Sequence, residues 1–344
     1  MIEKMLVTTW DDYLALFAPT SRDVYFTEDY VRLYEDDEQQ AVCFVYQEND
    51  RILLFPFLRR AFMWKNKQYF DFETAYGYGG PIINIDDKGF ARRALLQLVE
   101  YCIENDYVAG FTRFHPILNN QEICKDMFSV IPDRQTVAID LNGSEEYIWK
   151  NEIHTKNRNV IKKGEKAGLM FVADYDYDYL NDFIHLYNST MDKLRAADFY
   201  YFDNDYYKQL VKKIPNSFLG VVKQDNKVIS AAIFFKSALY GHYHLSGSDK
   251  SKLSLSPNNF MLWEAAKEFK RLGCQWFHLG GGTTSSSEDS LFCFKRRFSK
   301  NTYTFNIGKF IFNKLVYEAL CDDWEVRNPC KVEQYKYFLM KYKL

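Results

Sequence analysis

Three basic residues at helical spacing are the first candidates for ligand chemistry in this sequence. Arg158, Lys162 and Lys166 stand at positions i, i+4 and i+8 of a helix predicted over residues 147–166, so their side chains lie on one helical face. A stripe of cations of this kind can hold the phosphates of a substrate. A solvated helix face is the commoner role of such a stripe, and the sequence alone leaves both interpretations open.

Two histidines stand two residues apart on a predicted strand. His242 and His244 are therefore expected to point to one face of a sheet, together with Ser246. The sequence offers no evident third carboxylate or thiol ligand, so the pair indicates a polar cleft wall and no metal site. His115 and His278 end other strands, where a general base would be useful, although a structural role fits them as well.

A helix predicted to begin at Pro257 could present backbone donors to a ligand. Ser256 is the expected N-cap, Pro257 suits the first helical position and Gly273 ends the run. The N–H groups near Asn258 and Asn259 would point out of the helix start with a partial positive charge, which suits an anionic or carbonyl ligand. An ordinary capped helix is the alternative.

The strand after this helix ends in Gly280, Gly281 and Gly282. Because these residues have no Cβ atoms, the backbone could come close to a ligand there. The run is not a phosphate-binding loop, since no Gly-Lys-Ser/Thr follows, and it is not a dinucleotide fingerprint, since the GxGxxG spacing is absent. On its own the run indicates only a flexible turn.

The elements that must position these residues alternate between helices and strands, which favours a mixed α/β sheet. Predicted helices span residues 10–17, 27–34, 90–104, 147–166, 179–195, 203–213 and 257–272. Predicted strands span residues 41–46, 51–63, 108–114, 136–141, 218–222, 228–235, 240–245 and 275–279. A loop, a helix and a strand precede both His115 and His278, so we expect a duplicated domain with a cleft between its halves, divided near residues 142–146.

Composition limits the class of protein. The 344 residues, 47% of them hydrophobic, are enough for two domains of ordinary size. The 44 basic and 46 acidic residues give no global electrostatic case for nucleic acid. Seven cysteines without a CxxC pair indicate reduced thiols of a cytoplasmic protein. No apolar run approaches the ~20 residues needed to span a bilayer, which leaves peripheral membrane contact open.

Four segments, taken in order, carry a resemblance to a known family. They are HLSGSD at 244–249, SPNN at 256–259, FHLGGG at 277–282 and DSLFCFKRRF at 289–298. This combination resembles the second half of the Fem-type peptidoglycan aminoacyltransferases and of related acyltransferases from polysaccharide gene clusters, which share the GNAT acyltransferase fold. RNVIKKGEKAGL at 158–169 is similar to the basic helix that opens their second domain, and YGYGGP at 76–81 to a first-domain loop.

The resemblance implies a fold and a set of site residues. The fold would be α/β (α+β), with two tandem GNAT-like domains at 1–143 and 144–317, each a mixed, mostly antiparallel sheet flanked by helices. Residues 318–344 would pack back on the first domain. Substrate-binding candidates are Arg158, Lys162, Tyr78, Gly79, His242, His244, Ser246 and Asp249. Donor-binding candidates are Ser256, Asn258, Asn259, Gly280, Gly281 and Gly282.

The resemblance also implies a catalytic residue. In the resembling enzymes a lysine in the Phe-Lys position of Lys295 lies at the reaction centre. An ammonium group there could stabilise the oxyanion that forms when an amine attacks an ester or thioester carbonyl. Arg296 and Arg297 supply the alternative, a basic surface run. Where relatives tend to carry an arginine, this chain reads DFYYFDND at 198–205, and the aromatic residues at 199–202 could stack on a sugar ring or fill core.

Two functional hypotheses follow. The first is an acyltransferase that moves an acyl or aminoacyl group from acyl-CoA or aminoacyl-tRNA, used as co-substrates with no permanent cofactor, to an amine of a cell-envelope precursor. That precursor would be a sugar nucleotide, a lipid-linked sugar or a muropeptide. Direct attack would explain why no Ser-His-Asp or Cys-His signature is present. The second is a non-catalytic module that binds a glycan or a partner on the same duplicated fold.

Overall fold

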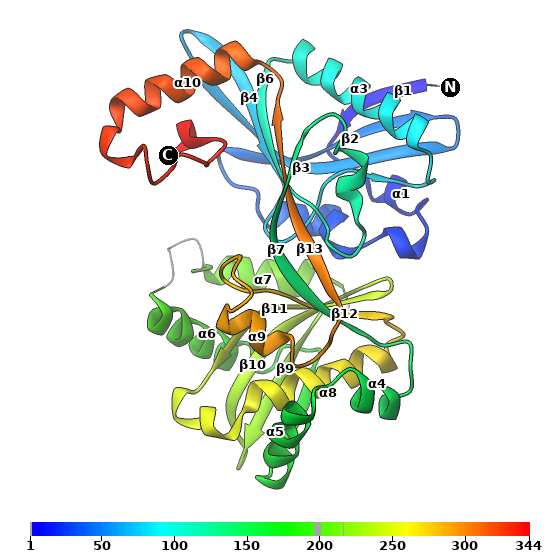
Figure 1. Ribbon diagram of the computed structural model, residues 1–344, viewed down its shortest axis with the longest axis vertical. Helices are drawn as coiled ribbons and strands as arrows, with labels where there is room; N and C mark the ends of the chain where they lie inside the picture. The colour runs from blue at the N-terminus through cyan, green and yellow to red at the C-terminus, as the bar shows by residue number, and fades with distance from the viewer. Residues whose placement is uncertain (1, 196–200, 216) are drawn as a thin grey trace. The chain divides into compact units, whose positions relative to one another are not determined.

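The chain forms two compact units, as the computed structural model shows for residues 2–195, 201–215 and 217–344 (Figure 1). Unit 1 consists of Met1–Asp133 and Phe305–Leu344, and unit 2 consists of Arg134–Thr304. The chain leaves unit 1 within strand β7 (Ser129–Asp140) and returns to it within strand β13 (Thr302–Ile311).

The division between the units differs from the expected domain boundary. It falls inside β7 and not in the linker predicted at 142–146, because β7 begins before the expected strand at 136–141 and its second half pairs with β12 (Trp276–Gly281). Residues 305–317, expected in the second domain, belong to unit 1 because the second half of β13 pairs with β6 (Tyr107–Arg113). The C-terminal segment 318–344 is part of unit 1 as well.

Unit 1 contains a mixed sheet in the order β1-β2-β3-β4-β6-β13, with β5 paired to β3. Its other strands are β1 (Ile2–Val7), β2 (Gln39–Glu48), β3 (Arg51–Trp64), β4 (Lys67–Glu73) and β5 (Ile82–Ile83). Its helices are α1 (Asp11–Leu14), α2 (Glu28–Arg32), α3 (Lys88–Glu104) and α10 (Lys314–Arg327), with 3-10 turns at Pro19–Ser21, Val24–Phe26, Asn120–Ile123, Pro329–Lys331 and Lys341–Lys343.

Helices α3 and α10 lie on opposite faces of this sheet. Tyr107 packs in the core that α3 covers, whereas the next residue, Val108, packs in the core that α10 and the C-terminal segment cover. Successive residues of a strand point to opposite faces, so β6 is buried on both sides. This explains why its sequence is a nearly continuous apolar run.

The strands of unit 2 pair in the order β7-β12-β11-β10-β9-β8, with both parallel and antiparallel neighbours. Its remaining strands are β8 (Met170–Asp174), β9 (Phe218–Gln224), β10 (Lys227–Ser237) and β11 (Tyr240–Ser248). Its helices are α4 (Glu145–Asn151), α5 (Thr155–Lys166), α6 (Leu180–Leu194), α7 (Asn204–Lys213), α8 (Pro257–Arg271) and α9 (Ser290–Lys295), with a 3-10 turn at Lys250–Leu255.

Both units contain the same supersecondary arrangement. In unit 1, α3 lies between the parallel strands β4 and β6, and in unit 2, α8 connects the parallel strands β11 and β12. Parallel neighbours need such a crossover, which is commonly a helix. The bounds of α8 agree with the helix predicted over 257–272, whereas the helix predicted over 147–166 is divided into α4 and α5.

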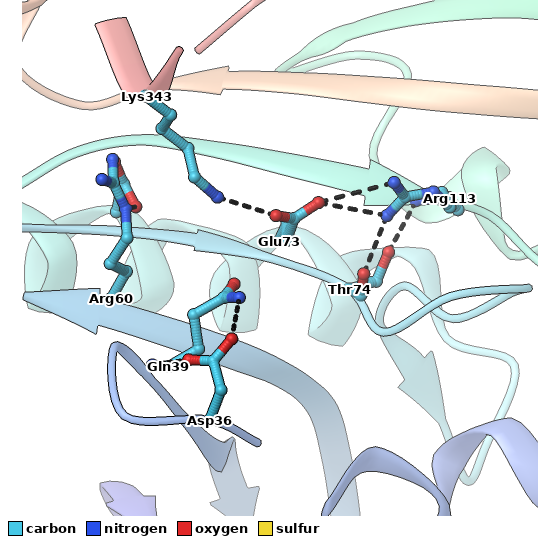
Figure 2. Close-up of polar contacts among 8 residues, drawn as sticks. Asp36, Gln39, Arg60, Glu73, Thr74, Arg113 and Lys343 are labelled. Atoms are coloured by element: carbon cyan, nitrogen blue, oxygen red, sulfur yellow. Dashed lines mark hydrogen bonds and ion pairs between the residues drawn. The ribbon is translucent and has the colours of Figure 1, made fainter. Parts of the chain in front are cut away.

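The C-terminal segment is attached to unit 1 through a carboxylate that two cations share (Figure 2). Glu73, at the end of β4, accepts a hydrogen bond from Lys343 Nζ at 2.7 Å and one from Arg113 Nη1 at 3.4 Å. Arg113 also donates to the Thr74 carbonyl at 2.8 Å. Burial opposes ionisation of Glu73, but the attraction of Lys343 and Arg113 outweighs it and lowers the pKa of the carboxyl.

Replacing Glu73 with Gln should lower the thermal midpoint of unfolding at pH 7 by about 2–4 °C, for a loss of about 1 kcal/mol. The pKa of Glu73 is lower in the folded state, so its ion pairs contribute stability above the ordinary Glu pKa and lose it as pH falls through the folded value. The difference between E73Q and the unmodified protein should therefore shrink below about pH 4. Calorimetry across pH measures this, with E122Q in the exposed Glu122–Lys125 pair as the control. Equal thermal midpoints of E73Q and the unmodified protein at pH 7 would show that the Glu73 ion pairs do not stabilise unit 1.

Candidate active site

Lys295 is a buried amine at the end of helix α9. Only 7% of the residue is exposed. Its Nζ donates a hydrogen bond to the Gly281 carbonyl at 2.7 Å and lies 5.9 Å from the centroid of the Tyr243 ring. Burial lowers the pKa of Lys295 to about 7, although the negative charge of Asp289 acts in the opposite direction. The amine can therefore change its protonation state near neutral pH.

Asp289 holds the turn that precedes α9. Its Oδ2 accepts hydrogen bonds from the Thr283 N–H at 3.1 Å and hydroxyl at 2.6 Å, and from the Thr284 N–H and hydroxyl, both at 3.1 Å. Its Oδ1 accepts from the N–H groups of Leu291 at 3.0 Å and Phe292 at 2.9 Å, which caps α9. The Thr283 hydroxyl and these other donors hold the pKa of Asp289 well below its usual range.

The glycine run is required by close packing within the chain. A Cβ on Gly282 would lie 2.4 Å from Asp289 Oδ1, and a Cβ on Gly281 would lie 2.8 Å from the Gln135 carbonyl oxygen. Gly280 has a φ of +75°, in the left-handed region that favours glycine. The space left by the absent side chains of Gly281 and Gly282 is therefore occupied by the protein itself, and donor binding at this run stays a prediction.

A bulge in β11 changes which side chains share a face. Tyr243 pairs with Phe234 while Leu245 pairs with Ile233, so one extra residue, His244, is inserted on β11. His242 pairs with Phe235, and the centroids of the His244 and Phe235 rings are 4.4 Å apart. Both histidines therefore lie on the face of the sheet that carries Phe235.

The expected position of Ser246 beside the two histidines is therefore wrong. Ser246 pairs with Ala232, which belongs to the same core as Phe234, and the Tyr243 hydroxyl donates to Ser246 Oγ at 2.5 Å. Period-two alternation predicts the other face because it does not account for the inserted residue. The consequence is that Tyr243, whose ring lies near Lys295, shares its side of the sheet with Ser246.

His244 contributes a neutral polar group, and the other candidate histidines have buried contacts of their own. Burial, assisted by the nearby His242, lowers the pKa of His244 to about 3, and the Tyr206 hydroxyl lies 3.1 Å from its Nε2. The rings of His242 and His278 are 5.7 Å apart. In unit 1, His115 Nε2 lies 2.8 Å from Asp23 Oδ2, and the Leu118 N–H donates to its Nδ1 at 3.1 Å. Both ring nitrogens of His115 are thus engaged in a buried structural contact.

The start of helix α8 is built differently from the sequence expectation. Within the described chain, the Ser256 side chain makes no capping hydrogen bond, and the residue adopts a left-handed conformation with a φ of +57°. Asn258 Oδ1 instead accepts hydrogen bonds from the hydroxyls of Ser230 at 2.7 Å and Ser248 at 2.8 Å. Asn259 Nδ2 donates to Asn157 Oδ1 at 2.6 Å. These side chains join α8 to two strands and to α5.

Arg158 has a structural role that its spacing did not indicate. Its Nη1 donates to the carbonyls of Trp149 at 3.1 Å, Lys150 at 2.8 Å and Ile153 at 2.7 Å, around the C-terminal end of α4. A cation at a helix C-terminus satisfies carbonyls that lack intrahelical partners. Lys162, on the same helix, is exposed. Phosphate binding by the pair stays a prediction, and Lys162 is the member whose charge faces solvent.

The remaining candidates lie in separate places. Asp249 Oδ1 accepts from the Ser251 N–H at 2.9 Å and closes the turn after β11. Tyr78 belongs to unit 1, with its ring 5.7 Å from that of His115, and the Gly79 carbonyl accepts from Asn120 Nδ2 at 2.8 Å. The aromatic stretch 199–202 falls partly on residues 196–200, which lie outside the described residues.

Two residues of this site were not identified from the sequence. Tyr243 lies between the two candidate histidines in the sequence, and its ring lies near Lys295 on the face of β11 opposite to His242. Asp289 opens the segment DSLFCFKRRF, where an aspartate before a short apolar run is a usable N-cap signal. Its four bonds to the threonines could not be read from that signal, because they depend on how the glycine turn folds back.

Part of the second unit matches a family model. Residues 153–290 match the model described as the acetyltransferase (GNAT) domain, which lies within unit 2 and covers less than half of the chain. No curated protein matches the chain significantly by sequence. In the described residues, no helix has the length and apolar character required to cross a membrane.

Solved structures extend the likeness to the whole fold. FemX is similar with a TM-score of 0.72 at 14% identity, over 92% of this chain and 99% of FemX. The C-terminal domain of a putative lysylphosphatidylglycerol synthetase from Agrobacterium fabrum gives 0.56 at 14% identity, over 93% and 95%. A tandem GNAT protein from the clavulanic acid biosynthesis pathway gives 0.50 at 8% identity, over 91% and 99%. These likenesses confirm two GNAT-like α/β domains and, for the fold, the resemblance to the Fem-type group.

Replacing Arg158 with Ala should destabilise unit 2 by about 2 kcal/mol, because three carbonyls at the end of α4 lose a charged donor. The thermal midpoint should fall by about 4–8 °C in a unit of this size. K162A is the matched control on the same helix face and should change stability by less than about 0.5 kcal/mol. Thermal unfolding of both variants measures this, and equal midpoints would remove the capping role of Arg158.

Proposed function

We propose that this protein is an N-acyltransferase or aminoacyltransferase in which Lys295 is the catalytic residue. The observation that supports this most strongly is that Lys295 is buried while the two following cations, Arg296 and Arg297, are exposed. A basic surface run would expose all three, because lysine is rarely buried without a specific reason. A buried amine whose pKa is near neutrality is typical of a functional site.

The proposed reaction is direct acyl transfer. The lone pair of the acceptor amine forms a C–N bond with the donor carbonyl carbon, and the carbonyl oxygen becomes negative. The Lys295 ammonium stabilises this oxyanion where water is scarce and electrostatic interactions are strong. The intermediate then collapses, the C–S or C–O bond of the carrier breaks, and the departing group takes up the proton that the amine loses. No covalent enzyme intermediate is needed.

Burial disfavours the cationic form of Lys295 that this role requires, and three neighbouring groups oppose that effect. The Gly281 carbonyl accepts its hydrogen bond, the Tyr243 ring presents a π system, and Asp289 supplies a negative charge. Together these groups offset part of the cost of burying an ammonium group. Lys295 thus combines a site shielded from water with a positive charge that a fraction of the molecules keeps at pH 7.

The proposed substrates are of two classes. The donor is acyl-CoA or aminoacyl-tRNA, and the acceptor is an amine of a cell-envelope sugar or peptidoglycan precursor. The structural neighbours support this range, since one is named for the synthesis of lysylphosphatidylglycerol and another is described in a form without AcCoA. We assign donor binding to the start of α8 and the glycine run. Acceptor binding is assigned to Lys162 and Arg158 and to the histidine strand β11.

Replacing Lys295 with Met should lower kcat by about 10²–10³ while leaving KM within a few-fold, since one oxyanion donor is lost and substrate contacts remain. Donor and acceptor are first identified by thermal shift with acyl-CoAs, nucleotide sugars and charged tRNA, because a ligand at 100 times its Kd stabilises by about 2.7 kcal/mol. R296M and R297M, which remove the exposed neighbours, are the controls. If all three variants are equally active, Lys295 is no catalytic residue and the non-catalytic binding module becomes the better explanation.

The pH dependence distinguishes an ammonium from a free amine. Because the pKa of Lys295 is about 7, the ammonium form is lost above that pH, and kcat should fall there in a single step. K295R keeps its charge across this range and should remove the alkaline limb from whatever activity it retains. A kcat that instead rises through pH 7 in the unmodified protein and is flat in K295M would assign Lys295 as a general base.

A further inference from the structure

We propose that Asp289 is a positioning residue for Lys295: its carboxylate holds the turn that carries the Gly281 carbonyl, and its negative charge favours the ammonium form of the lysine. This inference rests on the proposed catalytic role of Lys295. It adds a residue that touches neither donor nor acceptor and acts through the lysine.

The first step of the argument is the turn itself. Oδ2 of Asp289 accepts all four donors that Thr283 and Thr284 offer, two from the backbone and two from the hydroxyls. Gly282 packs so closely on this carboxylate that a Cβ there would lie 2.4 Å from Oδ1. The carboxylate thus determines where the chain turns after Gly281. The Gly281 carbonyl in turn accepts the hydrogen bond of Lys295 Nζ at 2.7 Å.

The second step is the helix that carries the lysine. The other oxygen, Oδ1, accepts the N–H groups of Leu291 and Phe292 at the start of α9, and Lys295 is the last residue of that helix. The Asp289 carboxylate therefore holds both partners of the Lys295–Gly281 hydrogen bond. It caps the helix that carries Lys295, and it fixes the turn that carries the Gly281 carbonyl. Side chains in such a site must be held within fractions of an ångström of the productive geometry.

A third contact supports the same turn from another strand. Arg134 on β7 donates through Nη1 to the carbonyls of Gly282 at 3.1 Å and Thr283 at 3.0 Å. The turn is therefore held by the Asp289 carboxylate, which accepts from its N–H and hydroxyl groups, and by the Arg134 guanidinium, which donates to its carbonyls. Breaking the Asp289 contacts should release the segment 281–284 even though Arg134 remains in place.

The fourth step is electrostatic. Burial disfavours the charged form of Lys295, and the charge of Asp289 opposes that effect. The Tyr243 ring also faces the amine, and it carries no charge at neutral pH because burial raises its pKa to about 12. Six hydrogen bonds keep Asp289 ionised, so its effect on Lys295 is present throughout the neutral range. A residue with only a structural role would not contribute this charge.

The decisive variant is Asp289→Asn, compared with Glu288→Gln, which removes one negative charge from the adjacent exposed position. In D289N we expect kcat to fall about 10-fold to 100-fold with KM nearly unchanged, as for a misplaced catalytic group. The Lys295 titration, followed by NMR of its side chain without substrate, should move about 1 pH unit lower. E288Q should keep the original kcat and titration. An unshifted titration in folded D289N, or an unchanged kcat, would overturn the proposal.

A second variant keeps the test decisive if D289N does not fold. Thr283→Ala combined with Thr284→Ala removes two hydroxyl donors to Asp289 and leaves its charge in place. We expect a lower kcat with the Lys295 titration unchanged, and the original kcat would refute positioning by the turn. The two proposals fail separately. Full activity of K295M removes the proposed function, whereas the NMR titration of D289N judges Asp289 whatever the activity is.

Discussion

The cost of burying an amine is the constraint on which the rest of unit 2 depends. An ammonium group taken out of water loses several kcal/mol of hydration, and a protein tolerates this only where polar partners are supplied. Lys295 receives a backbone carbonyl, an aromatic face and a nearby carboxylate. Each partner needs its own support: the carbonyl requires the glycine turn, and the carboxylate requires its six donors. The burial of Lys295 Nζ therefore requires its three partners and also the residues that hold those partners in place.

The bulge in β11 shows how a backbone irregularity can decide the composition of a site. Without the extra residue, strict alternation would place Tyr243 opposite to both His242 and His244 and separate it from Ser246. With the bulge, Tyr243 and Ser246 share the face on which Lys295 lies, and the two histidines line the other face with Phe235. Bulges are frequent beside active sites because they redirect single side chains while the rest of the ladder is kept.

The sequence predicted what depends on local signals and missed what depends on distant partners. Helix α8 was predictable because Pro257 and Gly273 are local signals for the start and the end of a helix. The capping role expected of the Ser256 side chain was wrong. The division between the units was not predictable. It falls inside β7, and a strand that begins in one unit and ends in the other shows no change of composition at the division. The contacts of Arg158 with α4 were missed for the same reason, since periodicity gives the face of a helix but not the carbonyls that end the helix before it.

The two units show how one arrangement can support different roles. Each has a helix between parallel strands, and in each the second strand leads to a buried polar group. In unit 1 that group is His115, whose two ring nitrogens are bonded to Asp23 and to the Leu118 N–H. In unit 2 the strand ends in glycines, and the group is Lys295, which donates to one carbonyl of its own turn. Both nitrogens of this imidazole already have partners, whereas a primary amine has three hydrogens when protonated and keeps capacity for a second acceptor. An oxyanion would use that remaining capacity, which is consistent with the proposed role of Lys295 in unit 2.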